Sequence, residues 1–455
     1  MFRKILIANR GEIALRIIRA CRELGISTVA VHSDVDEKAL HVRFADEAVC
    51  IGPGPAPLSY LNIPAIIAAA EISGADAVHP GYGFLSENPE FASICGECGL
   101  TFIGPSPQNM KQWGNKVEAR KLATRLGIPL AQGSDTLKNA QDAATQAKAV
   151  GFPVMLKAAG GGGGRGMHII RNEEQMLRVF PSAQAEALAG FGNGDLYCER
   201  FVEEPRHIEF QVACDGKGIT RVLGERECSI QRRHQKLVEE APSVAVSEEL
   251  RADMAATITR AMNESAYQSL GTLEFLMDEK GELSFMEMNT RVQVEHPVTE
   301  LVTGVDLVVE QIRIAAGEAM TIPDTHLTPR GHAIECRINA EDPKTFAPSP
   351  GLITEYYPPG GAGIRVDSGI YGGWKVPPHY DSLLAKIISY GNNREQAIAR
   401  MKRALGETII TGIKTNIALH EFFLDQPHFR SGDISTRFVE RLDFSKMPEA
   451  QSSKG

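Results

Sequence analysis

Short apolar runs alternate with amphipathic helical patterns over the first 112 residues. Residues 4–8 predict a buried strand, residues 12–24 an amphipathic helix that Gly25 ends, and residues 27–32 the next strand. Further β-rich runs lie at residues 48–51, 77–79 and 101–103. Because strands separated by helices form βαβ units, this region is expected to fold as a doubly wound parallel sheet.

The pattern changes after residue 112. Helical patterns at residues 115–126 and 139–150 precede an apolar run at 152–157, a glycine-rich loop, and a second β run at 167–170. Strand, glycine loop and strand predict a hairpin lid. Further strands are expected at residues 196–199, 207–213, 273–277 and 283–289, followed by a helix after Gly304.

A strand-rich third region begins near residue 330. Strands are expected at residues 331–338, 364–366 and 384–389, and helices at 394–406 and 416–424. A prior of about one domain per 150 residues also gives three domains for 455 residues. The expected α/β and α+β multidomain chain has an N-terminal domain at 1–112, a middle domain at 113–328 with its lid at about 130–200, and a C-terminal domain at 329–447.

Five polar residues alternate with apolar ones at the end of the middle region. They are Glu287, Asn289, Arg291, Gln293 and Glu295, and Pro297 follows them. Side chains of an extended strand have a period of two, so all five are expected on one face, where they would supply metal ligands, an anion clamp and a base. An ordinary strand with one wet face is the alternative. The order of carboxylates, amides and guanidinium favours function.

Two carboxylates in this region are placed symmetrically about a plausible turn. Glu274 and Glu287 flank Lys280-Gly281, so they would face each other across an antiparallel pair, where like charges repel unless a cation lies between them. With Asn289 they form a set of hard oxygen ligands suited to Mg²⁺ or Mn²⁺. Two exposed glutamates are the alternative, and the glycine loop favours a metal–nucleotide site.

The glycine loop at residues 160–166 is a candidate phosphate site. It contains the spacing of a dinucleotide-binding fingerprint, but a strand pattern follows it where that fold requires a helix, and the chain has no P-loop motif. Backbone N–H groups of such a loop can lie over phosphates, with Lys157 neutralising charge. A plain linker is the alternative.

Composition excludes several classes of protein. The net charge of −9 argues against general affinity for nucleic acid or an anionic membrane, and we expect no signal peptide and no membrane span. The eight cysteines show no disulfide framework, and the pair Cys95 and Cys98 lacks the partners of a zinc site. A cytoplasmic protein is therefore expected.

The chain resembles biotin carboxylase, the ATP-grasp component of biotin-dependent carboxylases. The resemblance runs from Ile5 to about residue 440 and covers residues 5–14, 79–88, 157–167, 226–242, 287–297, 335–342 and 379–382. No biotin-accepting Met-Lys-Met segment or carboxyltransferase region follows, so we expect the stand-alone subunit. The implied reaction is ATP- and bicarbonate-dependent carboxylation of biotin through carboxyphosphate.

The resemblance implies specific roles for residues of this sequence. Phosphates would be contacted by Lys116 and Lys157 beneath Gly162, Gly163, Gly164 and Gly166. The nucleotide would be lined by Glu199, Arg200, Val202, His207, Gln231 and His234. The metal ligands would be Glu274, Glu287 and Asn289. Bicarbonate would be bound by Lys236, Arg291, Gln293 and Val294.

Four further residues complete the implied site. Glu295 would be the general base for bicarbonate, in an ionised state that Arg291 would favour. Arg337 would stabilise the biotin enolate, and Tyr82 and Asp381 would lie near the biotin pocket. Two positions depart from the family pattern. Arg200 stands where lysine is common at the adenine edge, and Asn115 stands where aspartate is common before the phosphate lysine.

The resemblance also implies cofactors and partners. These are ATP, Mg²⁺ or Mn²⁺, bicarbonate, biotin on a biotin carboxyl carrier protein, carboxyltransferase subunits, and a second copy in a homodimer. Acetyl-CoA carboxylase and hence fatty acid biosynthesis are the expected setting, with a pyruvate or other acyl-CoA carboxylase as the alternative. Another ATP-grasp ligase is disfavoured by Arg291, Gln293 and Glu295 together with Arg337. A non-catalytic nucleotide-binding subunit is disfavoured by the intact metal ligands and base.

Overall fold

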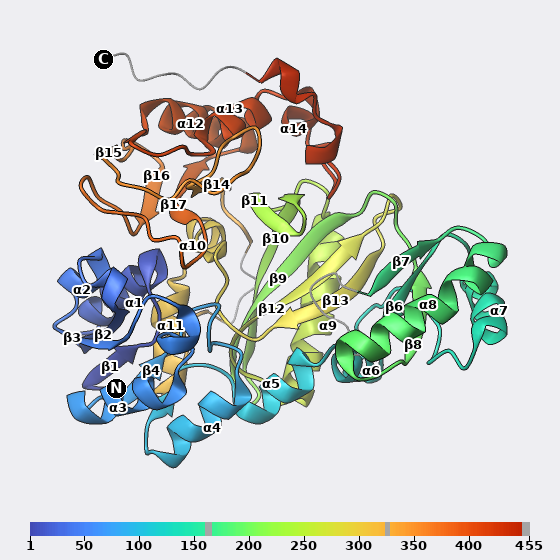
Figure 1. The fold of residues 1–455 in the computed structure, drawn as a ribbon, viewed down its shortest axis with the longest axis horizontal. Coiled ribbons are helices and arrows are strands. Elements are labelled where there is room, and N and C mark those ends of the chain that lie inside the picture. Colours follow the sequence, from blue (N-terminus) through green and yellow to red (C-terminus); the bar gives the residue numbers. More distant parts are fainter. Residues whose placement is uncertain (160–165, 324–327, 448–455) are drawn as a thin grey trace.

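A parallel sheet and a larger antiparallel sheet carry most of the strands in the computed structural model, which describes residues 1–159, 166–323 and 328–447. Figure 1 shows the parallel sheet at one end of the molecule, next to the strands β16 and β17 of the larger sheet. A third, three-stranded sheet lies at the opposite end (Figure 1).

The N-terminal region forms a five-stranded parallel sheet with strand order β3-β2-β1-β4-β5. Its apolar strands are buried on both faces. Ile5 and Ile7 pack in one core with helices α1 and α11, whereas Leu6 packs in another with α3 and α4. This is the doubly wound sheet that the sequence predicts. Its elements are β1 (Lys4–Ile7), α1 (Gly11–Glu23), β2 (Ser27–Ser33), α2 (Leu40–Phe44), β3 (Glu47–Gly52), α3 (Ile63–Ser73), β4 (Ala77–His79), α4 (Pro89–Glu97), β5 (Thr101–Phe102) and α5 (Pro107–Gly114).

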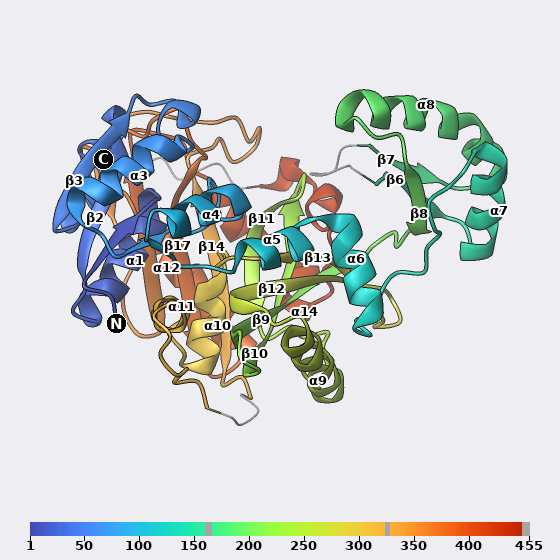
Figure 2. The ribbon, with the colours of Figure 1, turned by 90° about the horizontal axis from the view of Figure 1, so that it is seen from below.

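The next segment forms a small body with its own core. Strands β7, β6 and β8 make an antiparallel sheet that packs with α7 and α8 around buried residues such as Leu156 and Phe180. Both ribbon views show this body standing off from the rest of the chain (Figures 1 and 2). Its elements, with the helix that precedes them, are α6 (Lys116–Arg125), α7 (Ala140–Val150), β6 (Val154–Ala158), β7 (Met167–Ile170), α8 (Glu173–Phe191) and β8 (Leu196–Arg200).

An eight-stranded antiparallel sheet spans the middle and the C-terminal thirds of the chain. Its order is β13-β12-β9-β10-β11-β14-β17-β16, and the β11–β14 pair joins the two thirds. The middle third contributes β9 (Arg206–Asp215), β10 (Thr220–Arg232), β11 (Gln235–Ala241), α9 (Glu248–Glu264), β12 (Gln268–Met277), β13 (Leu283–Asn289), α10 (His296–Thr303) and α11 (Leu307–Ala315). The boundary at 328/329 remains a prediction, and the sheet is continuous across it.

The C-terminal third covers its strands with helices. Ile398 and Met401 of α12 and Phe423 of α13 pack against Ile334 and Ile387 of the large sheet. Its elements are β14 (His332–Asn339), β15 (Glu355–Tyr357), β16 (Ile364–Ser368), β17 (Leu383–Gly391), α12 (Arg394–Glu407), β18 (Ile409–Thr411), α13 (Ile417–Leu424) and α14 (Pro427–Ser431).

One sequence-based prediction of secondary structure is wrong. The strand expected at residues 283–289 is β13, but the extended face expected to run from Glu287 to Glu295 does not form, because β13 ends at Asn289 and α10 begins at His296. Pro297 is in the first turn of that helix, where its missing N–H costs nothing. The helix expected after Gly304 is α11; Gly304 ends α10 at a φ of +75°, and Asp306 caps α11 by accepting from the Val309 N–H.

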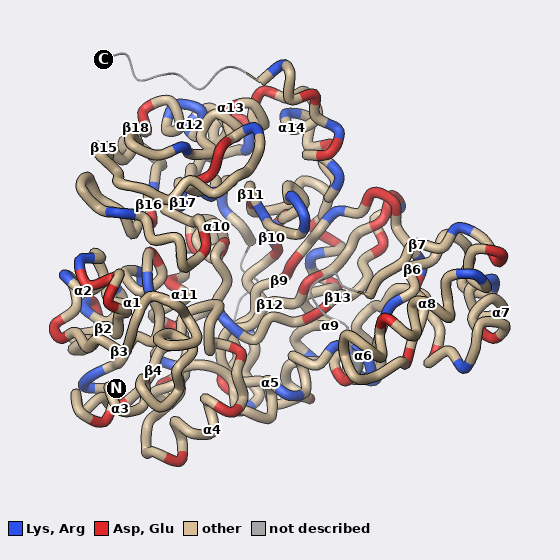
Figure 3. The backbone as a smooth tube through the Cα atoms, in the orientation of Figure 1, with Lys and Arg blue, Asp and Glu red and all other residues tan. Residues whose placement is uncertain are grey.

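Charges of both signs are distributed along the whole backbone (Figure 3). Within the described ranges, no helix combines the length and the apolar character that crossing a membrane would require.

We predict that the small body formed by α7, β6, β7, α8 and β8 unfolds locally when its core is opened. Phe180 is 2% exposed, and Phe180→Ala should cost about 3–5 kcal/mol because it leaves a cavity. Hydrogen exchange should then accelerate in residues 140–158 and 166–200, while β9 and β12 keep their protection.

Leu188→Ala on the same helix is the matched control, because Leu188 is 59% exposed and should change stability by less than about 0.5 kcal/mol. Equal effects of the two substitutions, or loss of protection throughout β12, would show that this body has no separate core.

Candidate functional site

Three carboxylates stand side by side across the large sheet. Glu274 on β12 is in register with Glu287 on β13 and with Glu209 on β9, and Glu209 is in register with Arg226 on β10. Glu274 faces Glu287 as the sequence predicts, but the turn alone does not set this pairing: a register shift between Glu274 and Phe275 brings the two glutamates opposite each other. We call Glu287, Glu274 and Glu209 the acidic row. Like charges at adjacent register positions repel, so this arrangement requires cations.

Lys236 supplies a cation at the centre of the site. Its Nζ lies 2.6 Å from Glu209 Oε2, 3.1 Å from Glu274 Oε1 and 2.6 Å from Glu295 Oε1. Burial would lower the pKa of this ammonium, but the surrounding acidic groups raise it well above its ordinary value. Lys236 is therefore a cation at neutral pH, and it brings Glu295 next to the acidic row.

The Glu295 carboxylate is held between two cations. Oε1 accepts from Lys236, and Oε2 accepts from Arg337 Nη2 at 2.9 Å. Burial would raise the pKa of Glu295, but Lys236, Arg337 and Arg226 together hold it well below its usual range. Glu295 is thus a buried carboxylate that is ionised at neutral pH, which is the state in which it can accept a proton.

Arg291 does not have the place that the sequence predicts. Because the strand ends at Asn289, residues 290–295 are irregular, and a common strand face does not align Arg291 with Glu295. The Arg291 guanidinium donates to Glu87 Oε2 at 2.8 Å and to Asn289 Oδ1 at 2.9 Å. The ionised state of Glu295 is favoured most by Lys236, Arg337 and Arg226, and the charge interaction between Arg291 and Glu295 acts in the same direction, as the sequence predicts.

Gln293 and Asn289 both contact Glu274. Each side-chain amide donates to Glu274 Oε1 at 2.8 Å. Gln293, two residues before Glu295, is thus brought to the acidic row by a turn and not by strand periodicity. Val294 lies between Gln293 and Glu295, and its carbonyl accepts a hydrogen bond from Lys386 Nζ at 2.8 Å.

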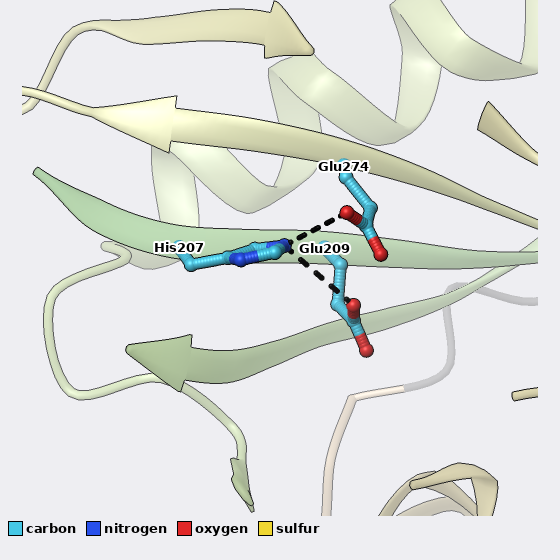
Figure 4. A group of neighbouring side chains, drawn as sticks. All are labelled: His207, Glu209 and Glu274. Carbon is cyan, nitrogen blue, oxygen red and sulfur yellow. Dashed lines mark ion pairs between the residues drawn. The ribbon is translucent and has the colours of Figure 1, made fainter. Parts of the chain in front are cut away.

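The candidate metal ligands form a set of oxygen donors. Glu287 Oε2 lies 2.9 Å from Lys116 Nζ, and Glu274 Oε2 lies 3.1 Å from His207 Nε2. Figure 4 shows His207 directed at both Glu274 and Glu209, the latter 3.9 Å away. Facing carboxylates with the nearby Asn289 amide match the ligand preference of Mg²⁺. His207, which the sequence analysis assigns to the nucleotide, lies beside this metal set.

Arg226 is the main residue of the site that the sequence analysis does not identify. Its guanidinium is fully buried and donates to five side-chain oxygens. These are Glu209 Oε1 at 2.5 Å, Gln211 Oε1 at 2.8 Å, Thr299 Oγ1 at 2.9 Å, Thr272 Oγ1 at 3.2 Å and Gln293 Oε1 at 2.7 Å. No local pattern around Arg226 distinguishes it from an exposed basic residue.

The candidate phosphate residues lie in two places. Lys157, at the end of β6, pairs with Glu199 Oε2 at 2.5 Å, whereas Lys116 lies at Glu287. Arg120, another residue that the sequence analysis does not identify, also pairs with Glu199. Gly166 has a φ of +70°, and Gly162, Gly163 and Gly164 lie outside the described residues.

The other candidate nucleotide residues are more open. Val202 and Gln231 are half-buried, while Arg200, at the end of β8, and His234, at the β10–β11 turn, are exposed. Arg200 and His234 are thus accessible to a ligand.

A cavity of about 310 Å³ lies at Tyr82, a residue that is close enough to Arg337 to feel its charge. Tyr82 and Asp381 line it, together with Arg10, Glu12 and His379. Arg337 Nε donates to Glu239 Oε1 at 2.6 Å, and the Arg337 cation acts to lower the pKa of Tyr82, which burial raises well above its ordinary value. The three candidate biotin residues are therefore brought into one region.

Comparison with known proteins identifies consecutive domains. Family models match at residues 1–110 (biotin carboxylase, N-terminal domain), 115–322 (carbamoyl-phosphate synthase L chain, ATP binding domain) and 335–441 (biotin carboxylase C-terminal domain). A biotin carboxylase of Nostoc sp. is 54% identical over 444 residues, which is 97% of this chain and 99% of that protein.

Two solved structures are similar over nearly their whole length. The biotin carboxylase–beta-gamma-ATP complex of Campylobacter jejuni has a TM-score of 0.92 at 46% identity, covering 97% of this chain and 99% of that one. The biotin carboxylase domain dimer of Hydrogenobacter thermophilus 2-oxoglutarate carboxylase, with MgADP, ADP and bicarbonate, has a TM-score of 0.90 at 51% identity, covering 97% of each chain.

We predict that the buried Arg226 guanidinium cannot be removed without a large loss of stability. Arg226→Met leaves the Glu209 carboxylate with fewer partners in a buried place, so the free energy of unfolding should fall by about 3–5 kcal/mol. Urea denaturation followed by fluorescence measures this loss. Arg125→Met, on the exposed side of α6, is the control and should have little effect. Similar midpoints for the two variants would contradict the importance of the Arg226 network.

Proposed function

The chain belongs to the biotin carboxylase family, and from this premise we propose how its residues divide the reaction between bicarbonate and biotin. The protein is an ATP-grasp ligase that carboxylates biotin at the expense of ATP. The observation that carries the division of labour is the Glu295 carboxylate held between Lys236 and Arg337, at 2.6 and 2.9 Å.

The first step uses Glu295 as the general base. Glu295 takes the proton of bicarbonate while a bicarbonate oxygen forms a bond to the γ-phosphorus of ATP, which gives carboxyphosphate and ADP. The low pKa of Glu295 keeps it ionised at neutral pH, and Lys236 stabilises negative charge on the bound anion. Arg291, Gln293 and Val294 complete the proposed anion site, in line with the contacts of Arg291 and Gln293 to Asn289 and Glu274.

The proposed metal ligands are Glu274, Glu287 and Asn289, with His207 beside them. Bound Mg²⁺ or Mn²⁺ neutralises charge on the transferring phosphoryl group. Lys116 and Lys157 add positive charge for the phosphates, and Gly162, Gly163, Gly164 and Gly166 would cover them. The ion pair with Glu287 holds the Lys116 ammonium at the acidic row, and the ion pair with Glu199 holds the Lys157 ammonium beside a residue proposed to line the nucleotide.

The adenine end of the nucleotide is assigned by resemblance. Glu199, Arg200, Val202, Gln231 and His234 are proposed to line it. The exposure of Arg200 and His234 agrees with a role in ligand contact. Arg200 and Asn115, which differ from the common family residues, are the positions where nucleotide contacts are expected to differ.

The second step carboxylates biotin. Carboxyphosphate breaks down to CO₂ and phosphate, phosphate removes the N1 proton of biotin, and N1 forms a bond to the carbon of CO₂. Arg337 is proposed to stabilise the enolate that this proton loss creates. Tyr82 and Asp381 are proposed to orient biotin, because both line the cavity beside Arg337's side of the site.

The physiological partners remain at the level of a proposal. We propose a biotin carboxyl carrier protein as the bearer of biotin, carboxyltransferase subunits as the consumers of carboxybiotin, and a cytoplasmic homodimer. The dimer and the bicarbonate complex described for the Hydrogenobacter protein support the homodimer and bicarbonate as substrate. Acetyl-CoA is the proposed final acceptor of the carboxyl group. The Hydrogenobacter protein is part of a 2-oxoglutarate carboxylase, so a related subunit can work with a different acceptor.

The division of labour predicts different effects of two substitutions. Glu295→Gln keeps the shape but removes the base, so bicarbonate-dependent ATP hydrolysis and carboxybiotin formation should both fall about 10²- to 10⁴-fold. Arg337→Ser should retain much of the ATP hydrolysis. Its rate of carboxybiotin formation should fall strongly, because the transition state loses roughly 3 kcal/mol of stabilisation.

Both activities should be measured at pH 8, because loss of the Arg337 cation raises the pKa of Glu295. Glu355→Gln, exposed on β15, is the control and should behave as wild type. Normal hydrolysis in Glu295→Gln, or normal biotin carboxylation in Arg337→Ser, would show that the roles are assigned wrongly.

The metal assignment predicts a separate effect. Glu287→Gln removes charge without volume, so the Mg²⁺ concentration for half-maximal turnover should rise about tenfold or more. Its surface ion pair with Lys116 contributes only about 0–1 kcal/mol, so the unfolding midpoint should change little. Glu282→Gln, exposed on the same hairpin, is the control. An unchanged Mg²⁺ requirement in Glu287→Gln would remove Glu287 from the metal site.

A further inference from the structure

Lys386 on β17 is a completely buried lysine outside the set of residues assigned to the reaction. Its side chain is 0% exposed, and its Nζ donates to the Val294 carbonyl at 2.8 Å. The same Nζ lies 3.2 Å from Glu12 Oε1 and 3.9 Å from Asp367 Oδ2. Burial would lower the pKa of Lys386, but Glu12, Glu335 and Asp367 raise it, so Lys386 is a cation.

These contacts join two parts of the site that are far apart in the sequence. Val294 lies in the turn between Gln293 and Glu295, so its carbonyl fixes the backbone that carries the base. Glu12, in the first turn of α1, accepts a hydrogen bond from the Tyr82 hydroxyl. Tyr82 and Glu12 both line the 310 Å³ cavity. Lys386 therefore contacts the backbone beside the base directly and the cavity wall through Glu12.

The register of the sheet places Lys386 next to the enolate residue. Lys386 on β17 is in register with Arg337 on β14, and Asp367 on β16 is in register with Lys386. A buried ion pair contributes little net stability compared with apolar residues of the same volume. A fully buried lysine bonded to a main-chain carbonyl and a carboxylate does, however, fix the relative positions of the segments it contacts.

We propose that Lys386 is a positioning residue that holds the Gln293–Glu295 turn and the Tyr82 wall of the cavity in a fixed relation. The proposal rests on the proposed function of Glu295 and Tyr82. Lys386 touches neither substrate. It acts by setting the Val294 carbonyl and the Glu12 carboxylate, so its loss should affect bicarbonate and biotin together and ATP much less.

The test uses the full chain with ATP, Mg²⁺, bicarbonate and free biotin. Lys386→Met keeps side-chain length but removes the charge and the donor. The KM values for bicarbonate and for biotin should both rise roughly tenfold or more, because small misplacements in a site are costly, while the KM for ATP stays within about twofold. Lys386→Arg, which keeps a cation and donors, should restore part of both losses.

Two further variants control for stability. Lys402→Met removes an exposed lysine that pairs with Asp425 on the surface, and it should match wild type. The double variant Glu12→Gln with Lys386→Met removes the carboxylate that would otherwise be buried without its partner. It should fold more stably than Lys386→Met and still show raised KM values for bicarbonate and biotin.

The outcomes separate this inference from the proposed function. An inactive wild-type chain would contradict the function itself. An active wild type with unchanged constants in Lys386→Met or the double variant would overturn only the role of Lys386. An equal rise of the KM for ATP, or loss of folding in all three Lys386 variants, would assign Lys386 a purely structural role and also overturn the proposal.

Discussion

The site depends on the repulsion between carboxylates that the large sheet places at neighbouring register positions. Glu287, Glu274 and Glu209 lie on β13, β12 and β9, and the fold keeps them there only because cations lie among them. Lys236 and Arg226 neutralise the buried end of the acidic row, and Lys116 pairs at its more open end. Burial of an isolated charge is costly. Each cation therefore stabilises the buried carboxylates that it contacts, and those carboxylates stabilise the buried cation.

The same pairs explain how substrates can enter without unfolding the site. Lys116 is exposed and Lys157 is half-buried. Both are proposed to contact phosphates, and they pair with Glu287 and Glu199, respectively. A metal ion at Glu287 would take over the neutralising role of the Lys116 ammonium and leave it free to meet a phosphate. Lys236 is much more buried and contacts three carboxylates, so it keeps its place while an anion binds beside it.

The sequence predicts the architecture and part of the site. Alternating strands and helices identify the parallel sheet. The sequence also correctly predicts that Glu274 faces Glu287, although a register shift that it does not predict completes this pairing. The strand at 283–289 is predicted correctly, but its continuation to Glu295 is wrong, because alternation of polar and apolar residues also occurs in the irregular segment before α10. Glu209, Arg226 and Lys386 could not be identified, since their roles come from pairing between strands distant in the chain. The long helices α8 and α9 are missed as well, although Asn172 and Ser247 cap them in the usual way.

The continuous sheet also explains why residues from two predicted domains can share one reaction. Lys236 on β11 and Arg337 on β14 belong to paired strands, so the backbone hydrogen bonds of the β11–β14 ladder fix the two cations relative to Glu295. Sites built on strands and helices hold their geometry more precisely than sites built on loops. The body formed by α7, α8 and β6–β8 has a separate core and brings Lys157 and Glu199. The residues proposed for bicarbonate and biotin thus lie mainly on or next to the continuous sheet, whereas Lys157 and Glu199, proposed for the nucleotide, belong to a body with a core of its own.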